Sequence, residues 1–404
     1  MTSPSRADFD LFDLPSDYFD DPYPYFHALR RHDPVHRNAD GSILLTRYRD
    51  VEAVWRDNRG VVDKAEIFQR RFGEGGLLEH HTSTMLFRDE PDHSRLRRCV
   101  EPLLTPKAVK RQEATVEALV DSLIDEALER GRLDFVEDFA LRLPMTMICS
   151  LLGVPVEDGP FLHEIGARIL FPLNPKVSEA AIADGNAAVD TFRSYLQPHF
   201  AAARTRLSGE PPETIIDACV AAEADLQLST DEMAHMCIIL LNGGHETTAN
   251  LLAGSVHALI DRPEALRHVA EAADMKPVVE EMIRFVTPLQ LQGRRTTEAI
   301  RLPEGQELPE GTEIILCQAS ANRDETVFVS PDQIDFDRPF SKHVSFGLGS
   351  HLCIGRFLAR LEATIALPRI LTRCGRIERT GPAVYRPNAR FRGLDTLPIA
   401  VTAA

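Results

Sequence analysis

The chain has 404 residues, of which 44% are apolar, and this is enough apolar material for a large buried core in a globular fold. Its formal net charge of −16, from 45 basic and 61 acidic residues, argues against a general nucleic-acid binder, because such a protein needs a basic surface. The seven cysteines include no C-x-x-C pair, which indicates a reducing compartment without a disulfide framework or a zinc site.

Neither a targeting segment nor a membrane span is expected. Residues 1–20 are polar and acidic and lack the apolar stretch that a signal peptide needs. The longest apolar helical candidate, residues 236–260, is interrupted by Asn242, His245 and Glu246. We therefore expect a cytoplasmic protein that has no membrane partner.

The first half of the chain predicts helices with a single hairpin among them. A helix near 22–32 precedes a hairpin in which Asp40-Gly41 joins 35–37 to 43–48. Residues 50–58 have a helical pattern, whereas the glycine-rich segment 70–92 predicts a long irregular loop. Further helices are predicted at 93–104, 106–131, 133–152, 158–170, 178–206 and 212–224.

The second half opens with a capping box, Ser229-Thr-Asp-Glu232, and a helix of about 45 Å that runs to about Ile260. A shorter helix starts at Pro277 and ends before Pro288. The remaining predicted elements are strands near 289–301 and 312–317, a turn-rich stretch at 320–345, a helix to about 373 and short closing strands. The fold class is mainly α with a minor β part. We expect residues 1–404 to form one domain with a small β-rich N-terminal lobe and a large helical lobe.

One cysteine lies in a glycine-rich loop just before a helix. In Phe346-Gly-Leu-Gly-Ser-His-Leu-Cys-Ile-Gly355, Cys353 precedes the helical run 356–362. The positive end of a helix dipole and nearby N–H donors favour the thiolate, and the glycines let the loop lie close to a flat ligand. Such a thiolate suits an axial ligand of haem iron. The alternative is a buried structural cysteine after a turn.

The spacing Phe-x-x-Gly-x-His-x-Cys-x-Gly closely resembles the haem-binding signature of the cytochrome P450 family. The resemblance implies a P450-like fold with a long central helix over haem b, and Cys353 as the iron ligand. It also implies that Phe346 and Gly347 belong to the haem-binding loop. The expected activity is insertion of one oxygen atom from O2 into an organic substrate.

A second motif, Gly243-Gly-His-Glu-Thr-Thr248, lies inside the long predicted helix. Glycines within a helix cost about 1 kcal/mol each relative to alanine, so two in a row indicate a purpose. One purpose is a kink for packing; another is a groove for a diatomic ligand beside a hydroxyl and a carboxylate. The zinc-protease motif H-E-x-x-H is excluded because Ala249 replaces its second histidine. The motif resembles the oxygen-activation motif of P450s, which implies that Glu246 and Thr247 relay protons beside Gly243.

Other matches to the family concern charged side chains. Glu281-Met-Ile-Arg284 resembles its Glu-x-x-Arg pair, and Arg338 matches the arginine with which that pair bonds. Haem propionates need cationic or hydrogen-bonding partners. The resemblance assigns this role to His93, Arg97, Arg294 and His351, and Arg295 is a rival to Arg294.

Electrons are expected from a separate protein. The Gly347-x-Gly349 loop lacks the third glycine of a dinucleotide fingerprint, so no dinucleotide-binding segment is expected in this chain. The resemblance then implies a ferredoxin, of [2Fe-2S] type, with a flavin reductase as the electron donor. A basic docking patch for it is predicted from Arg95, Arg98, Lys107, Arg356 and Arg360.

A small hydrophobic or aromatic substrate is expected, with hydroxylation or O-dealkylation as the reaction. The candidate pocket residues are apolar: Leu77, Leu78, Met85, Leu86, Ile239, Leu240 and residues 289–291. Ordinary core packing is the alternative for each of them. Two other functions stay open, namely a peroxide-driven oxygenase and a haem-binding sensor or carrier without catalysis.

Overall fold

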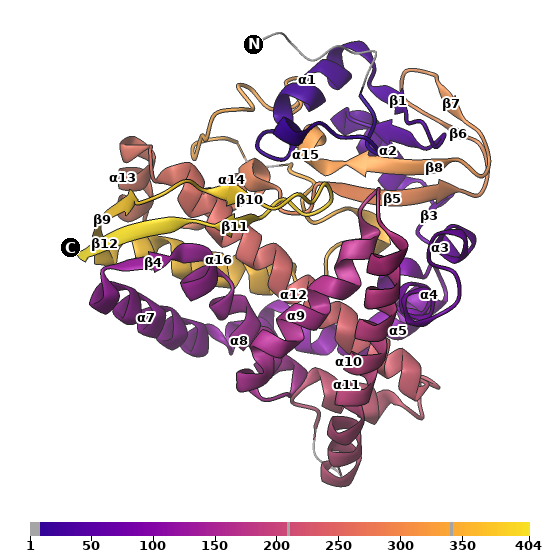
Figure 1. Cartoon of the computed structure of the whole chain (residues 1–404), viewed down its shortest axis with the longest axis horizontal. Coiled ribbons are helices and arrows are strands. Elements are labelled where there is room, and N and C mark those ends of the chain that lie inside the picture. Colours follow the sequence, from indigo (N-terminus) through magenta and orange to yellow (C-terminus); the bar gives the residue numbers. More distant parts are fainter. Residues whose placement is uncertain (1–8, 208–210, 340–341) are drawn as a thin grey trace. The chain divides into compact units, whose positions relative to one another are not determined.

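The computed structural model describes residues 9–207, 211–339 and 342–404, and these are mostly helical with a minor β part, as predicted (Figure 1). The described chain divides into two compact units. The first takes the chain up to Gly60, Glu113–Leu143 and everything from Thr247 on, and the second takes Val61–Gln112 and Pro144–Glu246. The single domain expected from the sequence stays a prediction.

The first unit contains a five-stranded sheet in the order β1-β2-β8-β5-β3. The hairpin β1–β2 is antiparallel with Val35 opposite Leu45, and Gly41 turns it with a φ of 89°, which glycine adopts at little cost. The strand β2 continues in parallel onto β8, which pairs antiparallel with β5. The strands are β1 (Val35–Arg37), β2 (Ile43–Leu45), β3 (Gly60–Val61), β5 (Leu291–Thr296) and β8 (Glu313–Cys317).

A three-stranded sheet, β4-β12-β9, carries two long helices of the same unit, and Figure 1 shows α7 beside β4 and β12. These elements are β4 (Arg132–Asp134), β9 (Cys374–Arg379), β12 (Pro398–Ala403), α7 (Glu113–Arg130) and α16 (Arg356–Arg373). The smaller strand pairs are β6 (Ile300–Arg301) with β7 (Glu307–Leu308), and β10 (Val384–Tyr385) with β11 (Leu394–Thr396). The other helices are α1 (Tyr23–His32), α2 (Tyr48–Arg56), α13 (Pro263–Glu271), α14 (Lys276–Val286) and α15 (Gln318–Ala321).

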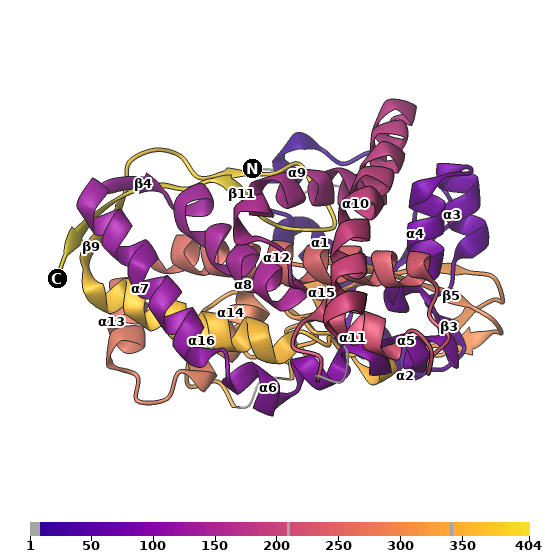
Figure 2. The same cartoon turned by 90° about the horizontal axis from the view of Figure 1, so that it is seen from below.

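The second unit is a helical assembly around α10, which packs against α4, α9 and α11. Figure 2 shows α3 beside α4 in this unit. Small residues allow the close approaches, because a Cβ on Gly76 would come within 2.9 Å of the Val189 side chain. The helices are α3 (Ala65–Phe72), α4 (Gly76–Ser83), α5 (Asp92–Val100), α6 (Pro106–Lys110), α8 (Arg142–Leu152), α9 (Gly159–Leu170), α10 (Glu179–Arg206) and α11 (Ile215–Ala222).

The longest helix, α12 (Thr230–Leu259), begins as predicted. The Glu232 N–H donates to Ser229 Oγ at 3.0 Å, and the Ser229 N–H donates to the Glu232 carboxylate at 2.9 Å. This capping box satisfies two N–H groups that a helix start leaves open. The helix continues without interruption through Gly243 and Gly244. No helix within the described ranges is long and apolar enough to cross a membrane.

Several predictions of secondary structure were wrong. The segment 70–92 is not a long loop but contains the end of α3, all of α4 and a 3-10 turn, Met85–Phe87. Its glycines were interpreted as helix breakers. Gly76 is instead the first residue of α4, where the absence of a side chain lets the helix pack against Val189. The predicted helix 106–131 is two helices, α6 and α7, and the one at 133–152 begins only after β4 and a π-turn. The helix α13 was not predicted.

A buried carboxyl group lies in α16. Glu362 is 0% exposed, and neither of its carboxyl oxygens has a hydrogen-bond partner among the residues that the structure describes. Burial raises the pKa of Glu362 to about 8, because the charged form loses its hydration. The folded state therefore holds this proton when the unfolded chain has already released it.

We predict that Glu362 makes the free energy of unfolding fall as pH rises from about 4.5 to about 8, by about 1.4 kcal/mol per pH unit within this window. The Glu362→Gln variant keeps a neutral side chain of the same shape and should lose this part of the slope. Denaturant unfolding at pH 5, 6, 7 and 8 measures it. Glu129→Gln, at an exposed site on α7, should keep the wild-type slope. Parallel curves for wild type and Glu362→Gln would contradict the prediction.

Candidate functional site

The loop around Cys353 is closed by its own backbone. The Cys353 N–H donates to the Phe346 carbonyl at 2.9 Å, and the Gly347 N–H donates to the Val344 carbonyl at 2.9 Å. Gly347 and Gly349 have φ values of 69° and 73°, which the turn requires and other residues rarely adopt. Three residues after Cys353 the helix α16 begins, so the sulfur lies near the positive end of a helix dipole.

Cys353 differs from the other cysteines in exposure. All seven lie within the described residues and none of them forms a disulfide, and six of them are buried, whereas Cys353 is half-buried. Burial raises the pKa of Cys149 to about 11 and that of Cys317 to about 12, so these two remain protonated. A metal ligand must be a thiolate within reach of the metal. Cys353 is therefore the cysteine that best fits haem ligation.

A buried ion cluster lies behind this loop. Arg284 on α14 is 0% exposed and donates to both carboxylate oxygens of Glu281, at 2.7 and 2.8 Å. Arg338 reaches the same carboxylate at 3.2 Å. The contacts between the Glu-x-x-Arg pair and Arg338 are thus confirmed. The remaining donors of Arg284 bond to three backbone carbonyls, those of Asn322, Pro331 and Gln333.

The segment held by Arg284 in turn holds the start of the cysteine loop. The Asn322 amide donates to Ser345 Oγ at 2.8 Å, and its oxygen accepts from the Val344 N–H at 2.8 Å. Ser345 Oγ donates back to the Ile283 carbonyl on α14 at 3.0 Å. The residues directly before Phe346 are thereby tied to the helix that carries Arg284.

A second ionic group joins α14 and α16. Glu280 accepts from Arg360 on α16 at 2.9 Å and lies 2.9 Å from His343 Nε2. Burial opposes ionisation of Glu280, but the hydrogen bonds from Arg360 and His343 outweigh it and lower its pKa to about 2. Arg360 is thus committed to an internal ion pair. The same holds for Arg95, which bonds to Glu232 and Asp92. These internal partners argue against the docking role predicted for the two arginines, which stays a prediction.

The two glycines of the α12 motif serve different purposes. A Cβ on Gly244 would come within 2.8 Å of Ile148 on α8, so this glycine permits close packing. A Cβ on Gly243 would meet no atom within 4 Å, apart from those of its own helix, and Gly243 is exposed. The helix surface at Gly243 therefore offers room for a flat group. Glu246 is buried and Thr247 half-buried.

The predicted propionate partners lie on three elements. His93 and Arg97 are one turn apart on α5; His93 is buried and lies 3.2 Å from Glu90, and Arg97 lies 3.4 Å from Glu101. On β5, Arg294 is buried and its neighbour Arg295 is half-buried. His351 is half-buried, two residues before the cysteine.

Histidines in the second unit were missed by the sequence argument. His80, His81 and His235 are buried together, and His80 Nδ1 lies 3.3 Å from His235 Nδ1. Burial lowers the pKa of His235 to about 4, so this imidazole stays neutral. Likewise, His163 on α9 meets His245 on α12. The signal for both groups was only a histidine within an apolar helical pattern, which is typical of core packing.

A cavity of about 610 Å³ lies elsewhere in the first unit and is lined by Arg323, Arg379 and Arg392 among others. Arg379 pairs with Asp261 at 2.5 Å, and Arg323 pairs with Asp332 at 2.9 Å. Arg392 stacks on Tyr385, 3.8 Å from the ring centroid. Two of these three arginines thus have carboxylate partners, and none of the predicted site residues lines the cavity.

Both the sequence and the structure of this chain are similar to those of known proteins. The sequence profile of the family described as Cytochrome P450 matches residues 41–377. A protein named "Cytochrome P450" from Bacillus subtilis (strain 168) is 31% identical over 394 residues, which cover 94% of each chain. The crystal structure of CalO2 has a TM-score of 0.90 at 31% identity and covers 98% of this chain and 99% of that one. P450BioI, in complex with acyl carrier protein ligated to hexadec-9Z-enoic acid, has a TM-score of 0.89 at 30% identity and covers 96% and 100%.

The chain therefore belongs to the cytochrome P450 family. It is a monooxygenase, an oxidoreductase with haem b as its cofactor and O2 as its co-substrate, and the haem iron of this family is ligated by a cysteine thiolate. The residues present fit this group, because a half-buried thiol lies at a helix start and the α12 surface at Gly243 is open.

The ion cluster predicts a large cost for its loss. In Arg284→Ala the buried Glu281 carboxylate loses its main partner, so we expect the free energy of unfolding to fall by about 3–5 kcal/mol. The cysteine loop should loosen with it, which lowers the fraction of haem with a thiolate ligand. Denaturant unfolding and the ferrous–CO spectrum measure the two effects.

Arg56→Ala is the matched control, because Arg56 forms an exposed pair with Glu52 and its loss should cost less than about 1 kcal/mol. The prediction fails if Arg284→Ala and Arg56→Ala are equally stable.

Proposed function

We propose that Cys353 is the axial ligand of the haem iron, with Phe346 and Gly347 in its loop. The observation that carries this proposal is the half-buried thiol in a hydrogen-bonded glycine loop, in a chain whose six other cysteines are buried. His93, Arg97, Arg294 and His351 are proposed as partners of the haem propionates. Arg294 is buried and donates to the Gly293 carbonyl at 2.9 Å, whereas its rival Arg295 is half-buried.

When bound, the thiolate-ligated haem supplies the oxygen chemistry, since the electron-rich sulfur favours O–O cleavage. The protein then has to hold the substrate and deliver protons. Glu246 is buried on α12 and Thr247 follows it, so a carboxylate and a hydroxyl lie within one turn of the open surface at Gly243. We assign proton delivery to these two side chains.

The proposed substrate is a small hydrophobic or aromatic molecule, which undergoes hydroxylation or O-dealkylation. Apolar side chains of the second unit support this: Leu77, Met85, Ile239 and Leu240 are buried, and Leu86 is 40% exposed. The complex of P450BioI with a fatty acyl carrier protein illustrates that one similar protein binds an apolar chain.

We propose a ferredoxin of [2Fe-2S] type, served by a flavin reductase, as the electron donor, because these 404 residues hold no dinucleotide fingerprint. Arg98 and Lys107 are exposed in the second unit and are the remaining docking candidates there. Seven cysteines with no disulfide among them support a reducing compartment, the cytoplasm.

The ligand assignment is tested with Cys353→Ala. We expect this variant to lose the thiolate-type Soret band of the ferrous–CO complex, because alanine supplies no sulfur to the iron. Cys149→Ala, which removes a buried thiol, should keep the band. If the band survives in Cys353→Ala and vanishes in another cysteine variant, the assignment is wrong.

The role of Thr247 is tested by coupling. In Thr247→Ala we expect spectra of substrate binding close to those of wild type, whereas reducing equivalents from NADH are diverted to peroxide because proton delivery is impaired. Thr248→Ala, at the next and buried position of α12, is the control and should stay coupled. An unchanged ratio of product to NADH in Thr247→Ala would remove Thr247 from the mechanism.

A further inference from the structure

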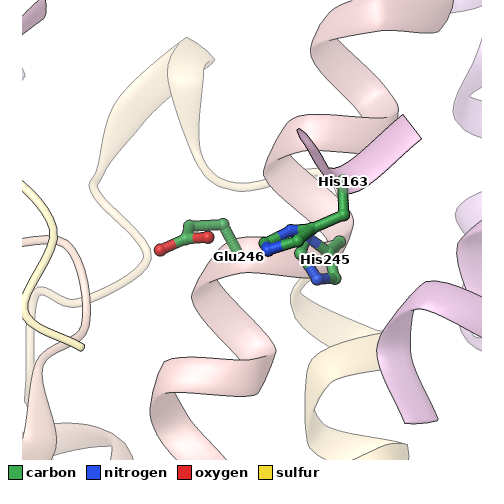
Figure 3. A group of neighbouring side chains, drawn as sticks. All are labelled: His163, His245 and Glu246. Carbon is green, nitrogen blue, oxygen red and sulfur yellow. The ribbon is translucent and has the colours of Figure 1, made fainter. Parts of the chain in front are cut away.

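Three metal-ligating side chains gather where α9 meets α12 in the second unit (Figure 3). His163 on α9 and His245 and Glu246 on α12 each offer one ligand atom, and these atoms lie within 4.8 Å of one another. The two imidazole rings meet edge to face with their centroids 4.7 Å apart. His245 and Glu246 are buried, and His163 is half-buried.

Close helix packing brings these side chains together. A Cβ on Gly166 of α9 would come within 2.2 Å of the Asn242 side chain on α12, so only glycine permits this approach. His163 is three residues from Gly166, and His245 is three residues from Asn242, which is about one helical turn in each case. The contact therefore fixes two rigid elements beside the cluster, as a metal site requires.

The donor set has the chemistry of a transition-metal site. Two imidazoles and one carboxylate suit Zn²⁺ and its neighbours, and three protein ligands leave a fourth position for water. With bonds of about 2.1 Å, tetrahedral ligand atoms are about 3.4 Å apart, so side chains whose ligand atoms lie within 4.8 Å of one another must close in by up to about 1.4 Å. Rotation about the side-chain bonds of His163 and Glu246 can provide this.

We propose that His163, His245 and Glu246 form a binding site for Zn²⁺ or a similar divalent transition-metal ion. No zinc site was expected from the sequence, because the cysteines form no C-x-x-C pair. The H-E-x-x-H motif was excluded because it requires a second histidine on the same helix. Here the additional histidine comes from α9 instead.

One consequence rests on the proposed function. Glu246 is also the proposed proton-delivering carboxylate, and a carboxylate that binds a metal is held in its anionic form. Occupation of the site should therefore withdraw Glu246 from proton delivery and divert reducing equivalents to peroxide. The metal ion would then act as an inhibitor of coupled turnover.

The site is tested on the haem-loaded enzyme after treatment with a chelator, by calorimetric titration with ZnCl2. Wild type should bind one equivalent, and His163→Ala should bind it at least about tenfold more weakly, because one ligand is gone. His199→Ala removes a half-buried histidine of α10 outside the cluster and should bind as wild type does. The proposal is overturned if wild type takes up no stoichiometric zinc, or if His163→Ala binds it equally well.

A second measurement separates the metal site from the role of Glu246. The ratio of peroxide formed to NADH consumed is recorded with and without zinc, in wild type and in His163→Ala, so that effects of zinc on the ferredoxin cancel. We expect zinc to raise the ratio in wild type only. Stoichiometric binding without any change in this ratio would leave the metal site intact and contradict proton delivery by Glu246.

Discussion

The position of the cysteine loop depends on one buried guanidinium. Arg284, Glu281 and Arg338 together carry one net positive charge, and the carbonyl oxygens of Asn322, Pro331 and Gln333 compensate it. A buried charge is tolerated only when its hydrogen-bonding capacity is filled in this way. These partners come from segments 38 to 49 residues further along the chain, so a single side chain gathers them. Asn322 then transmits this order to the residues before Phe346.

Local signals made much of the fold predictable. The hairpin at Gly41, the capping box at Ser229 and the glycine loop before α16 each depend on residues within a few positions of one another. Predictions failed where distant packing decided the outcome. Gly76 was interpreted as a loop residue, yet it begins a helix. The lack of a side chain at Gly76 leaves room for Val189, which lies more than a hundred residues further along the chain.

The candidate site was predictable to a similar extent. Motifs indicated Cys353, Glu246 and Thr247 as candidates. The ion pairing of the arginines predicted as docking charges did not follow from any motif. Arg360 was expected at the surface, and its partner Glu280 lies 80 residues earlier in the chain. The meeting of His163 with His245 depends on a helix contact that no sequence spacing records.

Two asparagines on α12 show how a mostly apolar helix carries polar groups. Asn242 lies against Gly166, and Asn250 lies against Gly393, where a Cβ would come within 2.1 Å of the amide oxygen. Asn250 also accepts a hydrogen bond from Arg386 at 3.3 Å. A glycine opposite each amide provides the space, so both asparagine side chains are accommodated without disturbing the helix α12.

The uneven burial of the thiols has a consequence for the chemical durability of the protein. Oxidants and alkylating reagents attack thiolates that they can reach, and six of the seven thiols are buried. Before haem is bound, attack is therefore directed at Cys353. Its sulfenic acid is reversible by thiols, but its sulfinic acid is not. With Cys353 as the proposed haem ligand, a newly made chain would have a limited time in which to acquire its cofactor, because oxidation of this one sulfur would remove the proposed ligand permanently.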